Sequence, residues 1–407
     1  MSDNPLRKLG RGIAAVWGAV DASRRFVMNF IFLVIVIFIL TSMFSSSEIK
    51  IEDKTALLLE IKGDIVEQHA GGSRDVLMAE LNGENKRSTQ LRDVLAALQH
   101  AAKDPKISSV VLNVEGMGSA GLASLREIAA AINEFKASGK KVIAWGSDFN
   151  QRQYFLAAHA NEVYLHPMGN VLIKGFGGYS NYYRDALDKI GVTVNVLKVG
   201  KFKNFAEPYV ANGPSDASKE AQAYLYSDLW KTYTTDVEKA RKIKEGAIAD
   251  SINNLPELVK VAKGSMAQVA LNAKWVDGLK TRDQIDQLML GLGAKDPHHS
   301  SYRNIKLSEY LATMPKRLFG EGVGVIIAEG EISGGMAPAG SIGGLSTANL
   351  IRDARENSQI KAIVLRVNSP GGSAFGSELI RHELELTKKA GKPVVISMGD
   401  VAASGGY

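Results

Sequence analysis

The chain has 407 residues, which is long enough for two or three domains of ordinary size. Its formal net charge is only +6, and no dense block of Lys and Arg follows residue 25, so nucleic acid is not an expected partner. Cysteine is absent, which excludes thiol catalysis, disulfides and thiolate metal sites.

The first predicted element is a membrane anchor at 26–44, a run of nineteen uncharged residues (FVMNFIFLVIVIFILTSMF). As a helix it would be about 28 Å long, close to the hydrocarbon thickness of a bilayer. Arg24 and Arg25 precede it, so the positive-inside rule predicts that 1–25 is cytoplasmic and that the rest lies outside the inner (plasma) membrane, on the periplasmic side. A cleaved signal peptide is the alternative, but the basic region and the apolar core are longer than such peptides have. We therefore expect a single-pass protein that contacts membrane lipid through 26–44.

Beyond the anchor, short β-type runs alternate with helical runs, which predicts an α/β fold with a largely parallel sheet. The chain also repeats itself at a spacing of 253 positions, because 107–114 (ISSVVLNV) aligns with 360–367 (IKAIVLRV) and the following helix and strand align without gaps. In this alignment Ser404 falls opposite Gln151. We predict two copies of one α/β unit, the second of which stops early and is expected to be incomplete.

The region between the copies is predicted to be mostly helical and to end in a polar stretch with the composition of a linker, which includes His298 and His299. These histidines lack a spaced acidic or histidine partner, so we expect exposed loop residues rather than metal ligands. The predicted organisation is therefore a first domain with a helical insertion at 55–290, a linker at 291–320 and a second domain at 321–407.

Residues that could perform chemistry gather at the end of the second copy. The run 394–397 predicts a buried strand, and 399–407 (GDVAASGGY) predicts the turn beyond its carboxyl end, where open α/β sheets bind ligands. Ser404 in such a turn would lie at a helix N-terminus, where unpaired N–H groups stabilise developing negative charge. Small neighbours such as Gly405 would let a substrate backbone approach. The alternative is that Ser404 only caps a helix.

A second turn, 368–373 (NSPGGS), follows the preceding strand of the same copy. Gly371 and Gly372 could present backbone N–H groups there as an oxyanion hole, and the alternative is an ordinary turn.

A serine nucleophile needs a base, and no histidine of the chain occurs in a recognisable triad motif or beside a G-x-S-x-G elbow. Lysine is the remaining option, provided that burial lowers its pKa toward neutrality. Lys203 lies between two aromatic residues, a setting compatible with such burial, but composition alone does not choose it over the neighbouring Lys198 and Lys201.

Three segments, 200–208 (GKFKNFAEP), 366–373 (RVNSPGGS) and 399–407 (GDVAASGGY), resemble the signature segments of the protease IV family, also called signal peptide peptidase A, in its long form. The resemblance covers nearly the whole chain, although the part that follows the nucleophile in the family is missing. It implies an anchor and two tandem domains of the ClpP/crotonase fold, with Ser404 as nucleophile and Lys203 as general base.

The same resemblance implies that Gly371 and Gly372 form the oxyanion region. It implies a serine endopeptidase that degrades cleaved signal peptides and other hydrophobic peptides at the membrane. It also implies a homo-oligomer, a tetramer, and no metal or other cofactor is expected.

Two alternative functions and one further motif have to be compared with this hypothesis. A crotonase-like enzyme acting on acyl thioesters would share the fold, but a membrane anchor argues against it. A catalytically silent, membrane-bound assembly or quality-control protein would be consistent with an incomplete second copy. Gly116, Gly118 and Gly121 form the G-x-G-x-x-G pattern of dinucleotide sites, but they do not follow the first strand of the unit and their repeat partner lacks the pattern.

Overall fold

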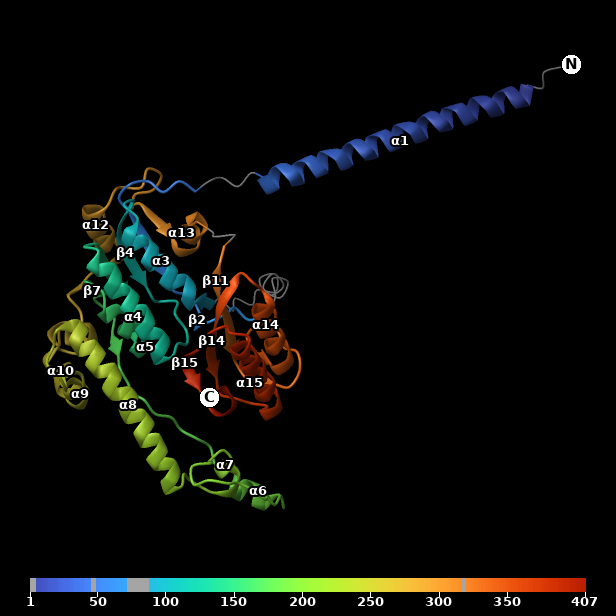
Figure 1. Cartoon of the computed structure of the whole chain (residues 1–407). Coiled ribbons are helices and arrows are strands. Elements are labelled where there is room, and N and C mark those ends of the chain that lie inside the picture. The colour runs from blue at the N-terminus through green and yellow to red at the C-terminus, as the bar shows by residue number, and fades with distance from the viewer. Residues whose placement is uncertain (1–4, 45–48, 72–87, 316–319) are drawn as a thin grey trace. The chain divides into compact units, whose positions relative to one another are not determined.

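The N-terminal part of the chain is a single long helix in the computed structural model (Figure 1). The chain divides into two units, Met1–Lys50 and Ile51–Tyr407. Helix α1 (Pro5–Phe44) contains the predicted anchor, and its stretch Val16–Ile39 is the one helical segment of the described residues that is long and apolar enough to cross a membrane. The structure describes residues 5–44, 49–71, 88–315 and 320–407.

The second unit begins with a six-stranded, fully parallel sheet in the order β10-β1-β4-β5-β7-β9. Val110 and Leu112 point to one face and join a large apolar core under helices α3 and α4, whereas Val111 points to the other face and packs with Met289 of α12. The elements are β1 (Thr55–Glu60), β4 (Ile107–Asn113), β5 (Lys141–Gly146), β7 (Glu162–Leu165), β9 (Gly278–Leu279), β10 (Asn304–Lys306), α3 (Leu91–Lys103), α4 (Leu122–Ala137) and α12 (Arg282–Leu292).

A second parallel sheet, β11-β14-β15, repeats the order and direction of β1-β4-β5. Leu59 pairs with Leu112 in the first sheet, and Ile326 pairs with Leu365 in the second. Figure 1 shows the second sheet with its two helices in red and orange. The predicted α/β class with tandem units is confirmed. These elements are β11 (Gly322–Glu329), β14 (Ile360–Ser369), β15 (Val394–Ala402), α14 (Gly344–Glu356) and α15 (Ala374–Lys389).

In both copies a lysine side chain caps the C-terminal end of a helix. The Lys140 ammonium donates to the carbonyl oxygens of Ala101 and Asp104 at 2.7 and 2.6 Å. Lys392 does the same at the end of α14, donating to Ala354 O at 2.9 Å and to a second carbonyl at 2.6 Å. A cation beside the last carbonyls of a helix is favourable because it meets the negative end of the helix dipole.

The repeat has one gap that the sequence comparison missed. Helices α4 and α15 are both 16 residues long, and they begin at Leu122 and Ala374, 252 positions apart. The spacing of 253 holds for β4 and β14 and changes in the turn that follows them. The spacing is again 253 where helix α5 (Gln151–Ala158) and the turn η1 (Ser404–Gly406) begin, so Gln151 stays opposite Ser404.

The segment predicted as a linker, 291–320, is partly built into the first sheet. Strand β10 pairs in parallel with β1, and helix α13 (Leu307–Thr313) buries Tyr310, whose hydroxyl donates to Asp104 Oδ2 at 3.1 Å. His298 and His299 are exposed, as expected of loop residues. The pairing adds an edge strand to the first sheet, which composition alone does not reveal.

Short elements complete the second unit. The small parallel pairs are β2 with β3, β6 with β8 and β12 with β13. Their bounds, with those of the remaining helices, are β2 (Asp64–Val66), β3 (Ser88–Gln90), β6 (Phe149–Asn150), β8 (Val171–Leu172), β12 (Ile332–Ser333), β13 (Ile342–Gly343), α5 (Gln151–Ala158), α6 (Arg184–Lys189), α7 (Glu207–Val210), α8 (Asp216–Arg241), α9 (Ala247–Asn253), α10 (Leu255–Val261) and α11 (Met266–Asn272).

Candidate active site

Ser404 lies directly beyond strand β15, at the first position of a three-residue 3-10 turn, η1 (Ser404–Gly406). Its side chain is exposed, and its backbone has a φ of 51°, a left-handed conformation that non-glycine residues rarely adopt. The turn is held by a hydrogen bond from Ala403 N–H to Ser369 O at 3.1 Å. An exposed hydroxyl is thus presented on a sharp turn at the carboxyl end of a parallel strand.

The glycine turn after β14 lies against this serine. Gly371 and Gly372 have φ values of 99° and 146°. A Cβ atom added to Gly371 would lie 2.7 Å from Ser404 Cβ and 2.8 Å from Gly405 N, so only glycine fits there. The structure therefore brings together four of the predicted site residues, three glycines and one serine, from two neighbouring strand ends.

The backbone N–H groups of these glycines differ in whether they are free. Gly371 N–H donates to Ser369 Oγ at 3.0 Å, and that hydroxyl in turn donates to a backbone carbonyl. Within the described residues, the N–H groups of Gly372 and Gly405 have no acceptor. The sequence predicted Gly371 and Gly372 as the N–H pair, whereas the pair left free is Gly372 and Gly405. Gly371 instead provides the space that lets the two turns meet.

The corresponding turn of the first copy is built in the same way. Ile65 N–H donates to Ser119 O at 2.9 Å, as Ile332 N–H donates to Gly371 O at 2.9 Å in the second copy. These bonds place Ala120 opposite Gly372, and neither of these two N–H groups has an acceptor among the described residues. The free N–H therefore belongs to the turn of both copies, and the second copy adds a serine of positive φ, Ser404, beside it.

An arginine that the sequence reasoning missed joins the two copies beneath this site. Arg366, on β14, has a side chain that is only 11% exposed, and it forms ion pairs with Glu67 at 2.7 Å and with Glu127 at 2.6 Å. Burial raises the pKa of Glu67, and the hydrogen bond from Arg366 opposes that shift. An arginine late in a largely apolar strand (IKAIVLRV) was the available signal, because a buried guanidinium needs carboxylate partners.

Lys203 is not brought to Ser404 in this chain. It lies in a turn before α7, where its N–H donates to Gly200 O at 3.4 Å, and its side chain is exposed. Phe205 is also 91% exposed, so the flanking aromatics do not provide the burial that the sequence suggested. No hydrogen bond or ion pair of the described residues engages the Lys203 ammonium, whereas Lys201 pairs with Glu220 at 3.0 Å.

Comparisons with known proteins give the family. The model for peptidase family S49 matches residues 134–292, a range that includes Lys203 but not Ser404. Protease 4 of Salmonella typhi is 36% identical over 413 aligned residues, which cover 99% of this chain and 67% of that protein. The chain belongs to peptidase family S49. Protease 4 of Haemophilus influenzae is 35% identical over 96% of this chain and 65% of its own length, so the chain spans about two thirds of these relatives.

A plant relative agrees with the serine class of this S49 chain. The chloroplastic serine protease SPPA of Arabidopsis thaliana is 27% identical over 75% of this chain and 45% of its own length. The family and the names of its relatives identify a serine-type peptidase. An N-terminal apolar helix fits a membrane-anchored member.

The G-x-G-x-x-G pattern of the first copy is explained by close packing around its three glycines. A Cβ on Gly116 would lie 3.2 Å from the Lys62 side chain, and a Cβ on Gly118 would lie 2.5 Å from Asp64 Oδ1. A Cβ on Gly121 would overlap the Asp400 carboxylate. Neighbouring protein atoms occupy the space beside all three glycines, which accounts for them without a nucleotide.

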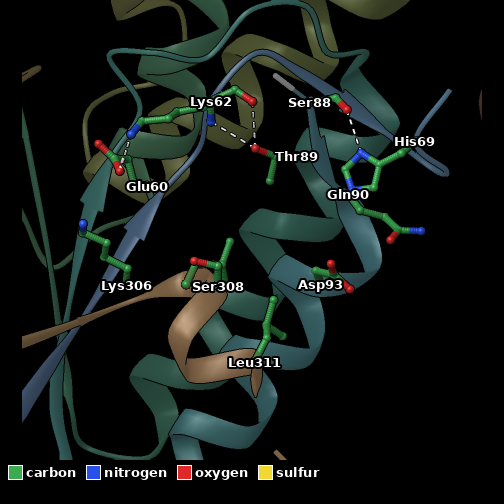
Figure 2. Close-up of a pocket in the computed structure, with 11 residues that line it drawn as sticks. Glu60, Lys62, His69, Ser88, Thr89, Gln90, Asp93, Lys306, Ser308 and Leu311 are labelled. Atoms are coloured by element: carbon green, nitrogen blue, oxygen red, sulfur yellow. Dashed lines mark hydrogen bonds and ion pairs between the residues drawn. The ribbon is translucent and has the colours of Figure 1, made fainter. Parts of the chain in front are cut away.

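A cavity of about 290 Å³ lies elsewhere in the second unit, between residues of the first copy and helix α13, and none of the predicted site residues lines it. Figure 2 shows an ion pair between Glu60 and Lys62 at 2.7 Å and a hydrogen bond between His69 and Ser88 at 2.7 Å on its walls. Within the described ranges, no group of three or more His, Asp or Glu side chains is arranged to hold a metal ion.

Proposed function

We propose that this chain is a membrane-anchored serine endopeptidase with Ser404 as nucleophile and Lys203 as general base. One observation carries the proposal: an exposed serine on a strained turn lies against a glycine turn, and two backbone N–H groups there have no acceptor in the described structure. A functional role accounts for this arrangement because strain and unsatisfied donors are costly and concentrate at active sites.

The proposed reaction is acyl transfer to water. Ser404 Oγ attacks the scissile carbonyl carbon while neutral Lys203 Nζ takes the hydroxyl proton, and the N–H groups of Gly372 and Gly405 donate to the resulting oxyanion. Collapse breaks the C–N bond, and the lysine gives its proton to the leaving amine. Water then attacks the Ser404 ester, with the lysine again as base, and releases the acid. Gly371 acts as the spacer that lets these groups meet.

Lys203 is favoured over its neighbour because its ammonium is uncommitted. Lys201 already pairs with Glu220 and lies 4.9 Å from the centre of the Phe202 ring. Lys203 has no such partner within the described chain, so its amine is free to serve as the base. The proposal requires the segment that carries Lys203 to approach Ser404 in the working enzyme.

We further propose that the substrates are cleaved signal peptides and other hydrophobic peptides at the membrane, with 1–25 in the cytoplasm and the peptidase unit outside. The apolar anchor and the two arginines before it support this orientation. A homotetramer is proposed as the working form. Its support is the apolar surface near the lysine, where Tyr179, Leu197 and Phe205 are 108%, 101% and 91% exposed.

The test is peptide hydrolysis by the detergent-solubilised chain with an internally quenched hydrophobic peptide, combined with covalent labelling by a fluorophosphonate. Ser404→Ala should abolish both signals, and Lys203→Ala should lower turnover about 1000-fold or more. Lys201→Ala is the matched control and should keep the wild-type rate. Hydrolysis that survives in Ser404→Ala, or a near-normal rate in Lys203→Ala, would overturn the dyad. A wild-type chain that never labels would favour a catalytically silent protein.

A further inference from the structure

The N-terminal end of helix α4, in the first copy, is capped by a residue of the second copy. Its N-cap residue is Gly121, which has no side chain to accept the N–H groups of the first turn, and that turn contains no acidic residue. Helix α15, the counterpart in the second copy, is capped locally, because Ser373 Oγ accepts from Gly376 N–H at 3.1 Å. The two copies therefore satisfy the N–H groups of the first helical turn with different acceptors.

The missing cap comes from Asp400, on the strand that leads to the nucleophile. Its Oδ2 accepts from Gly121 N–H at 3.0 Å, its Oδ1 accepts from Ser124 N–H at 2.8 Å, and the Ser124 hydroxyl donates to Oδ2 at 2.7 Å. Both carboxylate oxygens are thus engaged by a 16-residue helix of the other copy. A carboxylate at a helix N-terminus is favourable because the donors and the helix dipole both attract negative charge.

The cap lies four positions before Ser404, and the residues between them are held from the other side. Val401 N–H donates to Asn368 Oδ1 at 3.0 Å, and Ala403 N–H donates to Ser369 O at 3.1 Å. The final stretch of β15 is therefore fixed between α4 of the first copy and β14 of the second. A strained serine needs such support, since its turn would otherwise relax toward ordinary backbone angles.

The first copy lacks this arrangement. The acidic residue nearest to the corresponding position of the first copy is Asp148, two residues after the end of β5. Its Oδ1 accepts from the backbone N–H and the side-chain amide of Asn170, at 2.9 and 2.6 Å, within its own unit. The carboxylate was thus available in both copies, and only the one that precedes the serine reaches across to the other copy.

We propose that Asp400 is a positioning residue that couples helix α4 of the first copy to the geometry of Ser404. The proposal rests on Ser404 being the nucleophile. Its role differs from that of a structural cap, because the consequence of its loss is a displaced hydroxyl and not only a weaker fold. A displacement of about 1 Å at a reacting atom costs about 100-fold in rate.

The experiment compares Asp400→Ala, the isosteric Asp400→Asn and the matched control Asp148→Ala in the full chain. Active sites are titrated with a fluorophosphonate so that kcat refers to folded, labelled enzyme. Asp400→Ala should lower kcat about 10- to 100-fold with KM nearly unchanged, Asp400→Asn should fall between it and the wild type, and Asp148→Ala should keep kcat. A wild-type kcat per titrated site in Asp400→Ala, even with a lower melting temperature, would overturn the proposal.

Amide hydrogen exchange separates this inference from the proposed function. Loss of the cap should speed exchange at Gly121 and Ser124 in Asp400→Ala, whether or not Ser404 proves to be the nucleophile. Unchanged exchange at both amides would overturn the link between Asp400 and α4. Faster exchange in a chain whose activity survives Ser404→Ala would keep the link and reject the catalytic assignment.

Discussion

Replacement of Gly371 by alanine perturbs the candidate site without removing a functional group. The new methyl would lie 2.7 Å from Ser404 Cβ and 2.8 Å from both Ala403 O and Gly405 N, and none of these atoms belongs to the end of a flexible side chain. Holding alanine at a φ of 99° costs about 1–3 kcal/mol, and the overpacking costs about as much again. We expect the free energy of unfolding to fall by about 2–6 kcal/mol and the kcat of labelled enzyme to fall about 100-fold, because the serine turn must move.

The matched control is Gly391→Ala, in the same unit. Gly391 has a φ of 82°, but a Cβ there would meet no atom within 4 Å, so only the backbone cost of about 1–2 kcal/mol applies. Urea unfolding gives the two stabilities, and hydrolysis per titrated site gives kcat. The reasoning would be refuted if Gly371→Ala kept the wild-type kcat, or if Gly391→Ala lowered kcat as much.

Three further results are expected. Arg366→Met should cost about 3–5 kcal/mol in urea unfolding because it leaves the buried Glu67 carboxylate without its partner. Arg381→Met breaks an exposed pair and should change the stability much less. Burial lowers the pKa of His159 below its usual 6.5, so below pH 6.5 the unfolded chain binds a proton that the folded chain does not. The stability of the folded chain should therefore fall with acidification. Melting temperatures measured against pH should fall less steeply in His159→Gln. Ser404→Gly should end hydrolysis yet raise stability by about 1 kcal/mol, because glycine accepts a φ of 51° without strain.

Much of the fold could be predicted because its signals are local. The apolar runs of β4 and β14 are buried strands, and the helices after them have the expected apolar faces. The turn at Ser404 follows its strand as expected, at the carboxyl edge of a parallel sheet. The prediction that this strand is buried was wrong, because β15 lies at the edge of its sheet and Val395 and Ile396 are 54% and 45% exposed. Short-range patterns of this kind carry the information for each element and for the meeting of two neighbouring strand ends.

The rest depends on partners that lie far away in the sequence. Asp400 meets Ser124 across 276 positions, and Arg366 meets Glu67 across 299, so no local pattern reveals either contact. The N–H of Gly371 is not free because it donates to the hydroxyl of Ser369, and the orientation of one hydroxyl cannot be predicted from a local pattern. The environment of a lysine is likewise set by what packs over it. The burial that two flanking aromatics suggested for Lys203 is therefore not found in the structure.

The comparison of the two copies distinguishes what the fold needs from what the site needs. A lysine that closes the end of a helix is present in both copies, Lys140 at α3 and Lys392 at α14, because both copies must satisfy the same carbonyl groups. The free N–H of the turn is shared as well, since Ala120 and Gly372 both lack an acceptor among the described residues. The serine differs, because Ser404 is the one serine of the described residues with a positive φ. A duplicated fold thus keeps the same turn in both halves, and the strained residue beside it distinguishes the second copy.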